Sequence, residues 1–162
     1  DYSSAASDVY KRQYIMSDDK KWPWEIYNEE TKDYNKYPKE YKEAVWWLNS
    51  KPIKDEPCYA VFMDKYPAVQ GHRLYIPKTK DAPGMIGLCF QEAYRDGMEM
   101  VNKGEIDGFN VGLNQNESAG QSIFWPHVHF IPRKKGDVTN QRNAGTRMSV
   151  YSIDPYNPEN KK

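Results

Sequence analysis

Apolar residues recur at two spacings along this chain, and each spacing predicts a different kind of element. Short apolar runs bounded by Pro, Gly or Asp are typical of β-strands. These runs are residues 59–63, 72–76 and 109–113, with a further strand inside 119–133. Apolar residues three and four apart predict a short helix over 38–49 and a long helix over 81–103. Strands with short links, then a long helix and more strands, indicate an α+β fold: an antiparallel sheet with one long helix packed on it.

The long helix has recognisable ends and an apolar stripe. Asp81 is expected to cap its first turn and Gly104 to end it. The stripe, expected to be core rather than a cofactor site, consists of Ile86, Cys89, Ala93, Gly97 and Met100, flanked by Phe90 and Val101. Gly87 and Gly97 each destabilise a helix by roughly 1 kcal/mol relative to alanine. They indicate either close packing on the sheet or a wrongly assigned helix, and the sequence leaves both open.

The short helix carries two adjacent tryptophans, and Pro38 suits its first position. Neighbouring residues cannot share one helix face, so we expect either Trp46 or Trp47 to pack outside the core. Residues 51–57 then form a loop between two prolines. Upstream, residues 14–37 are polar with scattered aromatics. These aromatics could stack on a base, but packing onto the core is the favoured interpretation, and no site is predicted there.

Composition narrows the function classes. The 23 basic and 23 acidic residues give zero formal charge, so neither a broad nucleic-acid surface nor an anionic-membrane surface is indicated. Cys58 and Cys89 lie in apolar surroundings without a CxxC motif, which indicates buried thiols in a reducing compartment rather than structural zinc. No apolar run reaches the roughly 18 residues of a membrane span. The sequence therefore predicts a soluble, cytoplasmic protein that binds neither nucleic acid nor membrane.

Candidate chemistry concentrates in residues 119–133, which hold two of the three histidines. His127 and His129 are two apart, so on a strand both imidazoles leave the same face. The small, polar run Gly120-Gln121-Ser122 lets backbone N–H groups approach an anion. An uncharged imidazole attacks phosphorus near neutral pH, and this pattern therefore favours His127 as a nucleophile, with His129 and Ser122 holding phosphate oxygens. A His-x-His pair alone is more often a surface feature or a partial metal site.

Two sequence blocks resemble the histidine triad (HIT) superfamily. The first is Gly-Gln-Ser, four further residues, His-Val-His and then Ile-Pro-Arg, and the second is residues 58–78, with Asp64 and His72 eight apart. Residues 109–114 provide a third match, and 135–138 resemble the bacterial branch. The resemblance covers residues 53–150 and implies a HIT-like domain. We accordingly divide the remainder into an N-terminal extension with a short helix (14–52), a mobile tail (151–162), and residues 1–13, which resemble a translated sequencing adapter or are a disordered tail.

The resemblance assigns roles to individual residues. It implies that His72 supports the catalytic histidines and that Asp64 accepts hydrogen bonds from ribose hydroxyls, although an Asx turn is the alternative for Asp64. Positions that the family uses for phosphate or leaving-group contacts match Asn114, Gly120, Gln121 and Ser122. The resemblance also implies a two-fold homodimer formed through the sheet and helix. No metal or other cofactor is expected.

The chain departs from the family pattern at Trp125, where the first histidine of the triad is expected, and at Lys80. We expect a hydrolase of dinucleoside polyphosphates or related nucleotide conjugates, in the bacterial dinucleoside polyphosphate hydrolase-like branch, that releases a nucleoside monophosphate through a nucleotidyl-histidine intermediate. The alternatives are a nucleotidyltransferase of the superfamily, which Pro126 favours and His129 opposes, and a non-catalytic nucleotide-binding module. A metal site of His72, His127 and His129 ranks third, because no carboxylate stands at ligand spacing.

Overall fold

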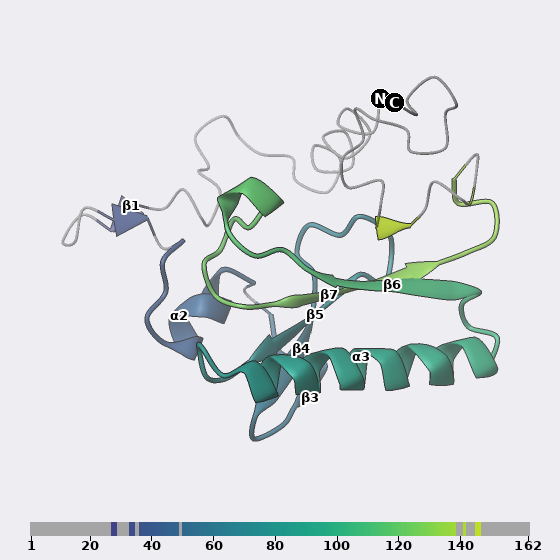
Figure 1. The fold of residues 1–162 in the computed structure, drawn as a ribbon, viewed down its shortest axis with the longest axis horizontal. Helices are drawn as coiled ribbons and strands as arrows, with labels where there is room; N and C mark the ends of the chain where they lie inside the picture. The colour runs from purple at the N-terminus through teal and green to yellow at the C-terminus, as the bar shows by residue number, and fades with distance from the viewer. Residues whose placement is uncertain are drawn as a thin grey trace, which may run out of the picture.

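The computed structural model describes residues 36–48, 50–138, 141 and 145–146, and the backbone of a short β1–β2 pair, Tyr27–Asn28 and Asp33–Tyr34. Its centre is a five-stranded antiparallel sheet in the order β3-β4-β5-β7-β6 (Figure 1). The strands are β3 (Lys54–Asp55), β4 (Tyr59–Met63), β5 (Arg73–Pro77), β6 (Gly108–Leu113) and β7 (Val128–Arg133). The helix α3 (Pro83–Asn102) lies along one face of the sheet. The predicted α+β fold with one long helix is therefore confirmed.

Most strand predictions hold to within one residue. β4 has the predicted bounds, β5 begins one residue later than predicted, and β6 begins one residue earlier. The last strand begins only at Val128, so His127 precedes it and does not lie on it. β3 was missed, since the segment 51–57 was expected to be a loop. Two residues at a sheet edge carry no alternating pattern that could reveal them.

α3 begins two residues later than predicted, and Asp81 does not cap it. The N-cap is Ala82, without a side-chain hydrogen bond, and Asp81 has a left-handed φ of 59°. An N-cap residue is extended, so Asp81 cannot occupy that role in this backbone. Gly104, with a φ of 72°, ends the helix as predicted.

α3 buries a narrow stripe against the sheet. Cys89, Ala93 and Gly97 are buried. Gly97 faces the ring of Phe109. Cys89 and Ala93 share a core cluster with sheet residues, namely Tyr59, Val61, Tyr75, Val128 and Phe130. Phe90, expected to flank this stripe in the core, is 37% exposed, whereas Glu92 is buried unexpectedly and pairs with Arg95. The other cysteine, Cys58, is only half-buried, so the prediction of two buried thiols holds for Cys89 alone.

The two internal glycines of α3 give a matched test of packing. A methyl group on Gly97 would lie 2.7 Å from the Phe109 ring, which stacks on Phe130, whereas a methyl on Gly87 meets nothing within 4 Å. We expect Gly97→Ala to lower the free energy of unfolding by about 1–3 kcal/mol despite its better helix propensity. Gly87→Ala should raise it by up to about 1 kcal/mol. Urea unfolding of both variants tests this, and equal effects would contradict the packing argument.

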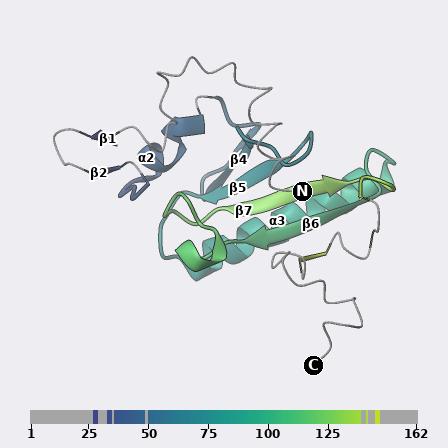
Figure 2. The same ribbon diagram turned by 90° about the horizontal axis from the view of Figure 1, so that it is seen from above.

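A second core cluster covers the sheet face opposite α3. It is built on α2 (Tyr41–Val45) and the 3-10 turn η2 (Trp46–Leu48), which replace the single predicted helix 38–49. α2 starts three residues after Pro38 because Glu40 and Glu43 form a capping box there. As predicted, one tryptophan lies outside the core: Trp47 is buried and Trp46 is 41% exposed. Figure 2 shows α3 running under β6 and β7, with α2 on the side of β4 and β5.

Several sequence predictions lie outside the described residues. These concern residues 1–13, most of 14–35, most of the segment after Val138, and the tail 151–162. Within the part of the chain that is described, none of the helices has the length and apolar character needed to cross a bilayer.

Candidate active site

The histidines lie on the sheet face opposite α3, where the end of β4 and the start of β5 meet the first residues of β7. Asp64 follows β4, His72 precedes β5, and His129 is the second residue of β7. Leu74 pairs directly with His129, and side chains of paired residues share a face, so His129 lies on the face of Leu74 and the α2 cluster. His127 lies next to this group, with its ring centroid 5.0 Å from that of His129.

A chain of hydrogen bonds fixes the tautomers of His72 and His129. The backbone N–H of Ala68 donates to His72 Nδ1 at 3.0 Å, so the proton of a neutral His72 ring must be on Nε2. His72 Nε2 lies 2.9 Å from His129 Nδ1 and donates to it. His129 Nδ1 is therefore an acceptor, and its proton is on Nε2.

The outer end of this chain has no partner. His129 Nε2 is buried and makes no hydrogen bond within the described residues. A buried N–H without an acceptor destabilises a folded protein, and such groups cluster where a ligand binds. The ring thus has an N–H donor available for a ligand oxygen, and the contact between His129 and phosphate stays a prediction.

His127 has the opposite tautomer. Its Nδ1 lies 2.7 Å from the carbonyl oxygen of Trp125, and because a carbonyl can only accept, Nδ1 carries the proton. The lone pair is then on Nε2, the nitrogen that a nucleophile requires. Trp125 supplies this carbonyl from its backbone, so the side chain of Trp125 plays no part in the contact.

Burial keeps all three imidazoles uncharged. Burial lowers the pKa of His127, and it lowers the pKa of His72 to about 4 and that of His129 to about 3, with repulsion from neighbouring histidines as a secondary cause for these two. The hydrogen bond to Trp125 opposes the decrease at His127. A neutral ring near pH 7 has the lone pair that nucleophilic attack needs, and it keeps one N–H as a donor.

The lowered pKa of His127 predicts how turnover depends on pH. A free histidine has a pKa near 6.5, and protonation would remove the attacking lone pair. We expect the acid limb of kcat/KM to be centred below pH 6.5, because burial lowers the pKa of His127. A pH profile with tryptophan fluorescence as a folding control tests this, and an acid limb centred at or above pH 6.5 would contradict it.

Asp64 is held by interior contacts on both oxygens. Oδ1 accepts from the backbone N–H of Tyr66 at 2.8 Å, which is the Asx turn given as the alternative, and Oδ2 lies 3.3 Å from His72 Nε2. Burial raises the pKa of Asp64 to about 6, and the Tyr66 amide opposes this. The position thus has a local structural role, and the ribose contact stays a prediction.

The metal site ranked third because no carboxylate stood at ligand spacing in the sequence, but the fold brings one to the histidines. Asp64, His72 and His129 place their ligand atoms within 4.8 Å of one another. The set still fits a metal poorly, because ligation by His72 Nε2 would move its proton to Nδ1, where the Ala68 N–H already donates. The spacing of these residues in the sequence did not indicate the cluster, because the turn between β4 and β5 brings Asp64 next to His72.

The predicted phosphate loop precedes the histidines and contains a second 3-10 turn, η3 (Glu117–Ala119). Gly120 has a φ of 88°, which only glycine adopts without strain. Gln121 is buried, and its side-chain oxygen accepts from the backbone N–H of Asn116 at 2.7 Å, so it braces the loop. Asn114 and Ser122 are exposed. Among the hydrogen bonds of the described residues, none joins these four predicted residues to a histidine, so their contacts with phosphate stay predictions.

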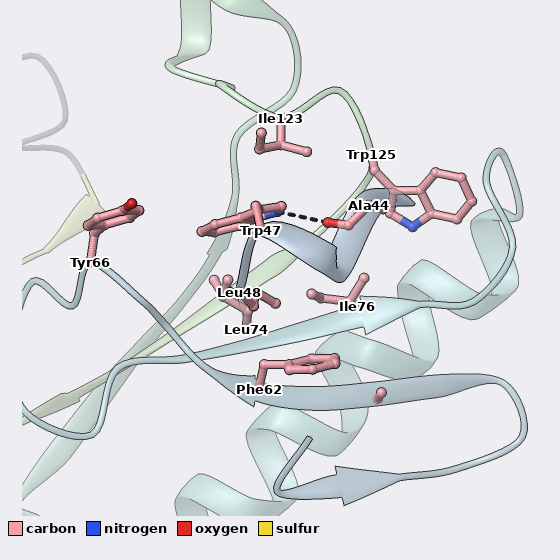
Figure 3. Close-up of a cluster of buried hydrophobic side chains, with 10 residues drawn as sticks. Ala44, Trp47, Leu48, Phe62, Tyr66, Leu74, Ile76, Ile123 and Trp125 are labelled. Carbon is pink, nitrogen blue, oxygen red and sulfur yellow. Dashed lines mark hydrogen bonds between the residues drawn. The ribbon is translucent and has the colours of Figure 1, made fainter. Parts of the chain in front are cut away.

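Trp125 forms part of the second core cluster. Its side chain is 3% exposed and its Nε1 donates to the Pro77 carbonyl at 2.8 Å. Figure 3 shows Trp125, Trp47 and Ile123 above Leu74 and Phe62 of the sheet. The side chain therefore packs in the core while the backbone carbonyl orients His127. The contact with His127 thus depends on the backbone of Trp125 and not on its side chain.

The N-terminal segment 36–48 contacts the loop after Asp64 and the loop before His127. Trp47 accepts a hydrogen bond from Lys65 Nζ at 3.0 Å and stacks on Tyr66 with ring centroids 6.2 Å apart, next to Asp64. The Phe124 N–H donates to the Lys36 carbonyl at 2.7 Å, next to Trp125. The sequence analysis missed the contributions of Ala68, Tyr66 and Lys36, because they act through backbone groups or packing.

Comparisons with known proteins agree on one family. The family model "HIT domain" matches residues 48–136, more than half of the chain. An adenylylsulfatase of Arabidopsis thaliana, HINT3, is 31% identical over 93 residues, which cover 54% of this chain but only 47% of that protein. The chain thus spans about half the length of that relative.

Further relatives cover more of their own length. The asymmetrical bis(5'-nucleosyl)-tetraphosphatase of Schizosaccharomyces pombe is 29% identical over 70% of each chain, and protein hit of Bacillus subtilis is 31% identical over 68% of this chain and 77% of its own. A zinc-bound histidine triad family protein from Mycobacterium smegmatis has a similar fold, with a TM-score of 0.51 at 23% identity over 68% of this chain and 92% of that one. The chain therefore belongs to the HIT family.

Proposed function

We propose that this protein is a nucleotide hydrolase that cleaves dinucleoside polyphosphates or related nucleotide conjugates at the α-phosphate and releases a nucleoside monophosphate. The observation that carries the proposal is the tautomer of His127, whose Nδ1–H donates to the Trp125 carbonyl and leaves Nε2 as a nucleophile. Beside it, the unpartnered Nε2–H of His129 is a donor for phosphate oxygens.

In the first step, His127 Nε2 attacks the α-phosphorus. A nitrogen–phosphorus bond forms, the bond from phosphorus to the leaving group breaks, and the leaving group departs with the electron pair. The ring keeps its Nδ1 proton and becomes cationic, and the Trp125 carbonyl oxygen, 2.7 Å away, stabilises that charge. His129 Nε2–H donates to a phosphate oxygen as negative charge develops there.

In the second step, water attacks the phosphorus of the nucleotidyl-histidine. The nitrogen–phosphorus bond breaks, its electron pair returns to Nε2, and the water gives up one proton to solvent and its oxygen to the nucleoside monophosphate. His72 contributes by orientation: held by the Ala68 amide, it keeps the His129 proton on the nitrogen that faces the ligand. Asp64, against His72 Nε2, supports the same ring.

The rival functions differ in the step after nucleophilic attack. A nucleotidyltransferase would pass the nucleotide to a second phosphate instead of water, and a binding module would form no covalent intermediate. The buried Trp125 leaves the orienting carbonyl in place, and this favours catalysis over binding alone. The names of two relatives, a tetraphosphatase and an adenylylsulfatase, support hydrolysis of nucleotide conjugates. Membership of the bacterial dinucleoside polyphosphate hydrolase-like branch is part of the proposal and rests on the resemblance of residues 135–138.

The experiment that tests the proposed function is turnover of diadenosine polyphosphates and adenosine 5′-phosphoramidate, with AMP release followed at pH 7. The proposal expects AMP from at least one class of substrate. AMP binding without release from any of them would support the binding module. AMP release that requires added inorganic phosphate or a sugar phosphate, with a new nucleotide as product, would support the transferase.

A homodimer and a cytoplasmic location complete the proposal. α3 exposes Phe90, Tyr94 and Met98 in one row, and Tyr94 packs edge-on against Phe109 of the edge strand β6. This apolar row beside β6, the outer strand of the sheet among the described residues, fits a second copy of the chain through a two-fold contact, and sedimentation equilibrium measures it. The free thiols of Cys58 and Cys89 suit a reducing compartment.

A further inference from the structure

We propose that Tyr37 and Phe124 form an aromatic platform that stacks the base of the leaving nucleoside, which makes dinucleoside polyphosphates the preferred substrate class. The inference rests on the proposed function and adds the leaving-group side of the site. It concerns a segment for which the sequence analysis predicted no site.

The two rings form a parallel pair at the surface. Their centroids are 4.9 Å apart with an interplanar angle of 17°, and Tyr37 is 50% exposed. Phe124 is only half-buried. The other described aromatics near the site have core contacts: Trp47 and Tyr66 stack on each other, and Trp125 is buried. Tyr37 and Phe124 therefore present a flat, apolar surface that neither core cluster uses.

The platform is fixed to the reactive loop. The Phe124 N–H donates to the Lys36 carbonyl at 2.7 Å, and this backbone contact holds Tyr37 beside Phe124. Phe124 is two residues after Ser122 and three before His127. A chain rises at most about 3.5 Å per residue, so the platform backbone lies within about 10 Å of the nucleophile backbone. A substrate joined to His127 through its α-phosphate can extend a second nucleoside over that distance.

The chemistry of the platform matches a nucleobase. Every base has a π-face that stacks on aromatic rings without sequence preference. Lys36 Nζ lies over the Tyr37 ring, 5.2 Å from its centroid, so the platform carries a positive charge that attracts the anionic phosphates attached to a stacked base. A leaving group without a ring, such as sulfate or ammonia, gains nothing from this surface. The platform therefore favours the chemistry named for the tetraphosphatase relative over that named for the adenylylsulfatase.

The test compares two substrates that share the adenylyl group and differ in the leaving group. With diadenosine tetraphosphate the leaving group is ATP, which carries the second nucleoside. With adenosine 5′-phosphoramidate the leaving group takes a proton from solvent and departs as ammonia. We expect Tyr37→Ala to lower kcat/KM for the tetraphosphate about tenfold, as expected for one lost stacking contact, and to change that for the phosphoramidate less than twofold. Tyr37→Phe should retain both rates, because the ring remains.

Trp46→Ala is the matched control, because Trp46 is a 41% exposed aromatic on the same N-terminal segment and should affect neither substrate. If Tyr37→Ala lowers kcat/KM equally for both substrates, or for neither, the platform is overturned. The proposed function is upheld in either case as long as the wild type releases AMP. If the wild type releases AMP from neither substrate, the proposed function itself fails and the platform with it.

Discussion

Replacement of His127 by alanine is expected to reduce turnover of every substrate by about 10⁴-fold or more, with nucleotide affinity changed little. The reason is that the unprotonated nitrogens of His72 and His129 already accept hydrogen bonds, whereas the Trp125 carbonyl holds the protonated nitrogen of His127 and leaves Nε2 as the nucleophile. Removal of a nucleophile abolishes the covalent route. Single-turnover AMP release and a separate measurement of AMP binding distinguish the loss of chemistry from the loss of the site.

His129→Asn is the matched variant, since asparagine keeps an N–H donor but lacks the link to His72. We expect a loss of about 10²- to 10³-fold, the effect of a weakened oxyanion contact. A His127→Ala protein that retained more than a tenth of wild-type turnover, or a His129→Asn protein that was the more damaged of the two, would show that the roles are assigned wrongly.

Replacement of Trp125 by alanine is expected to lower the free energy of unfolding by about 3–5 kcal/mol and the melting temperature by about 10 °C. The indole is 3% exposed in the second core cluster. Its loss also leaves the Pro77 carbonyl without the N–H that donates to it. Thermal unfolding followed by circular dichroism measures the change. Trp46→Ala removes a tryptophan that is 41% exposed and should shift the melting temperature by only about 1 °C.

Trp125→His distinguishes a structural role from a catalytic defect at this position. A histidine restores the residue type that the resemblance assigns there, but it fills less of the cluster with Trp47 and Ile123. We expect a less stable protein without a gain in kcat/KM, because the backbone carbonyl already orients His127. A more active Trp125→His protein would show that the tryptophan impairs catalysis.

The sequence was informative where side-chain periodicity decides structure. The spacing of Cys89, Ala93 and Gly97 predicts the face that α3 buries, and the short apolar run of β4 predicts its bounds. Periodicity is silent at β3, which has two residues, and at Asp81, whose left-handed backbone follows from the loop and not from its side chain. The capping box that starts α2 at Tyr41 was present in the sequence and was overlooked in favour of Pro38.

For the candidate site, the sequence predicted which residues meet but not which proton each one carries. His72, 57 residues from His129, was joined to it only by resemblance, and the structure places the two rings in hydrogen-bond contact. Their tautomers depend on the Ala68 amide and the Trp125 carbonyl. Every residue has both backbone groups, so no pattern of side chains singles out these two. The same reason hid the Lys36 carbonyl, which fixes Phe124.

The most direct test of the account is to trap the intermediate. Protein mixed with diadenosine tetraphosphate or adenosine 5′-phosphoramidate is quenched in alkali, which preserves phosphoramidate bonds, and its peptides are examined by mass spectrometry. The account predicts a transient AMP adduct on the peptide that contains His127, formed and lost at the rate of turnover and absent from His127→Ala. AMP release without any adduct, or an adduct on His129 or His72, would contradict it.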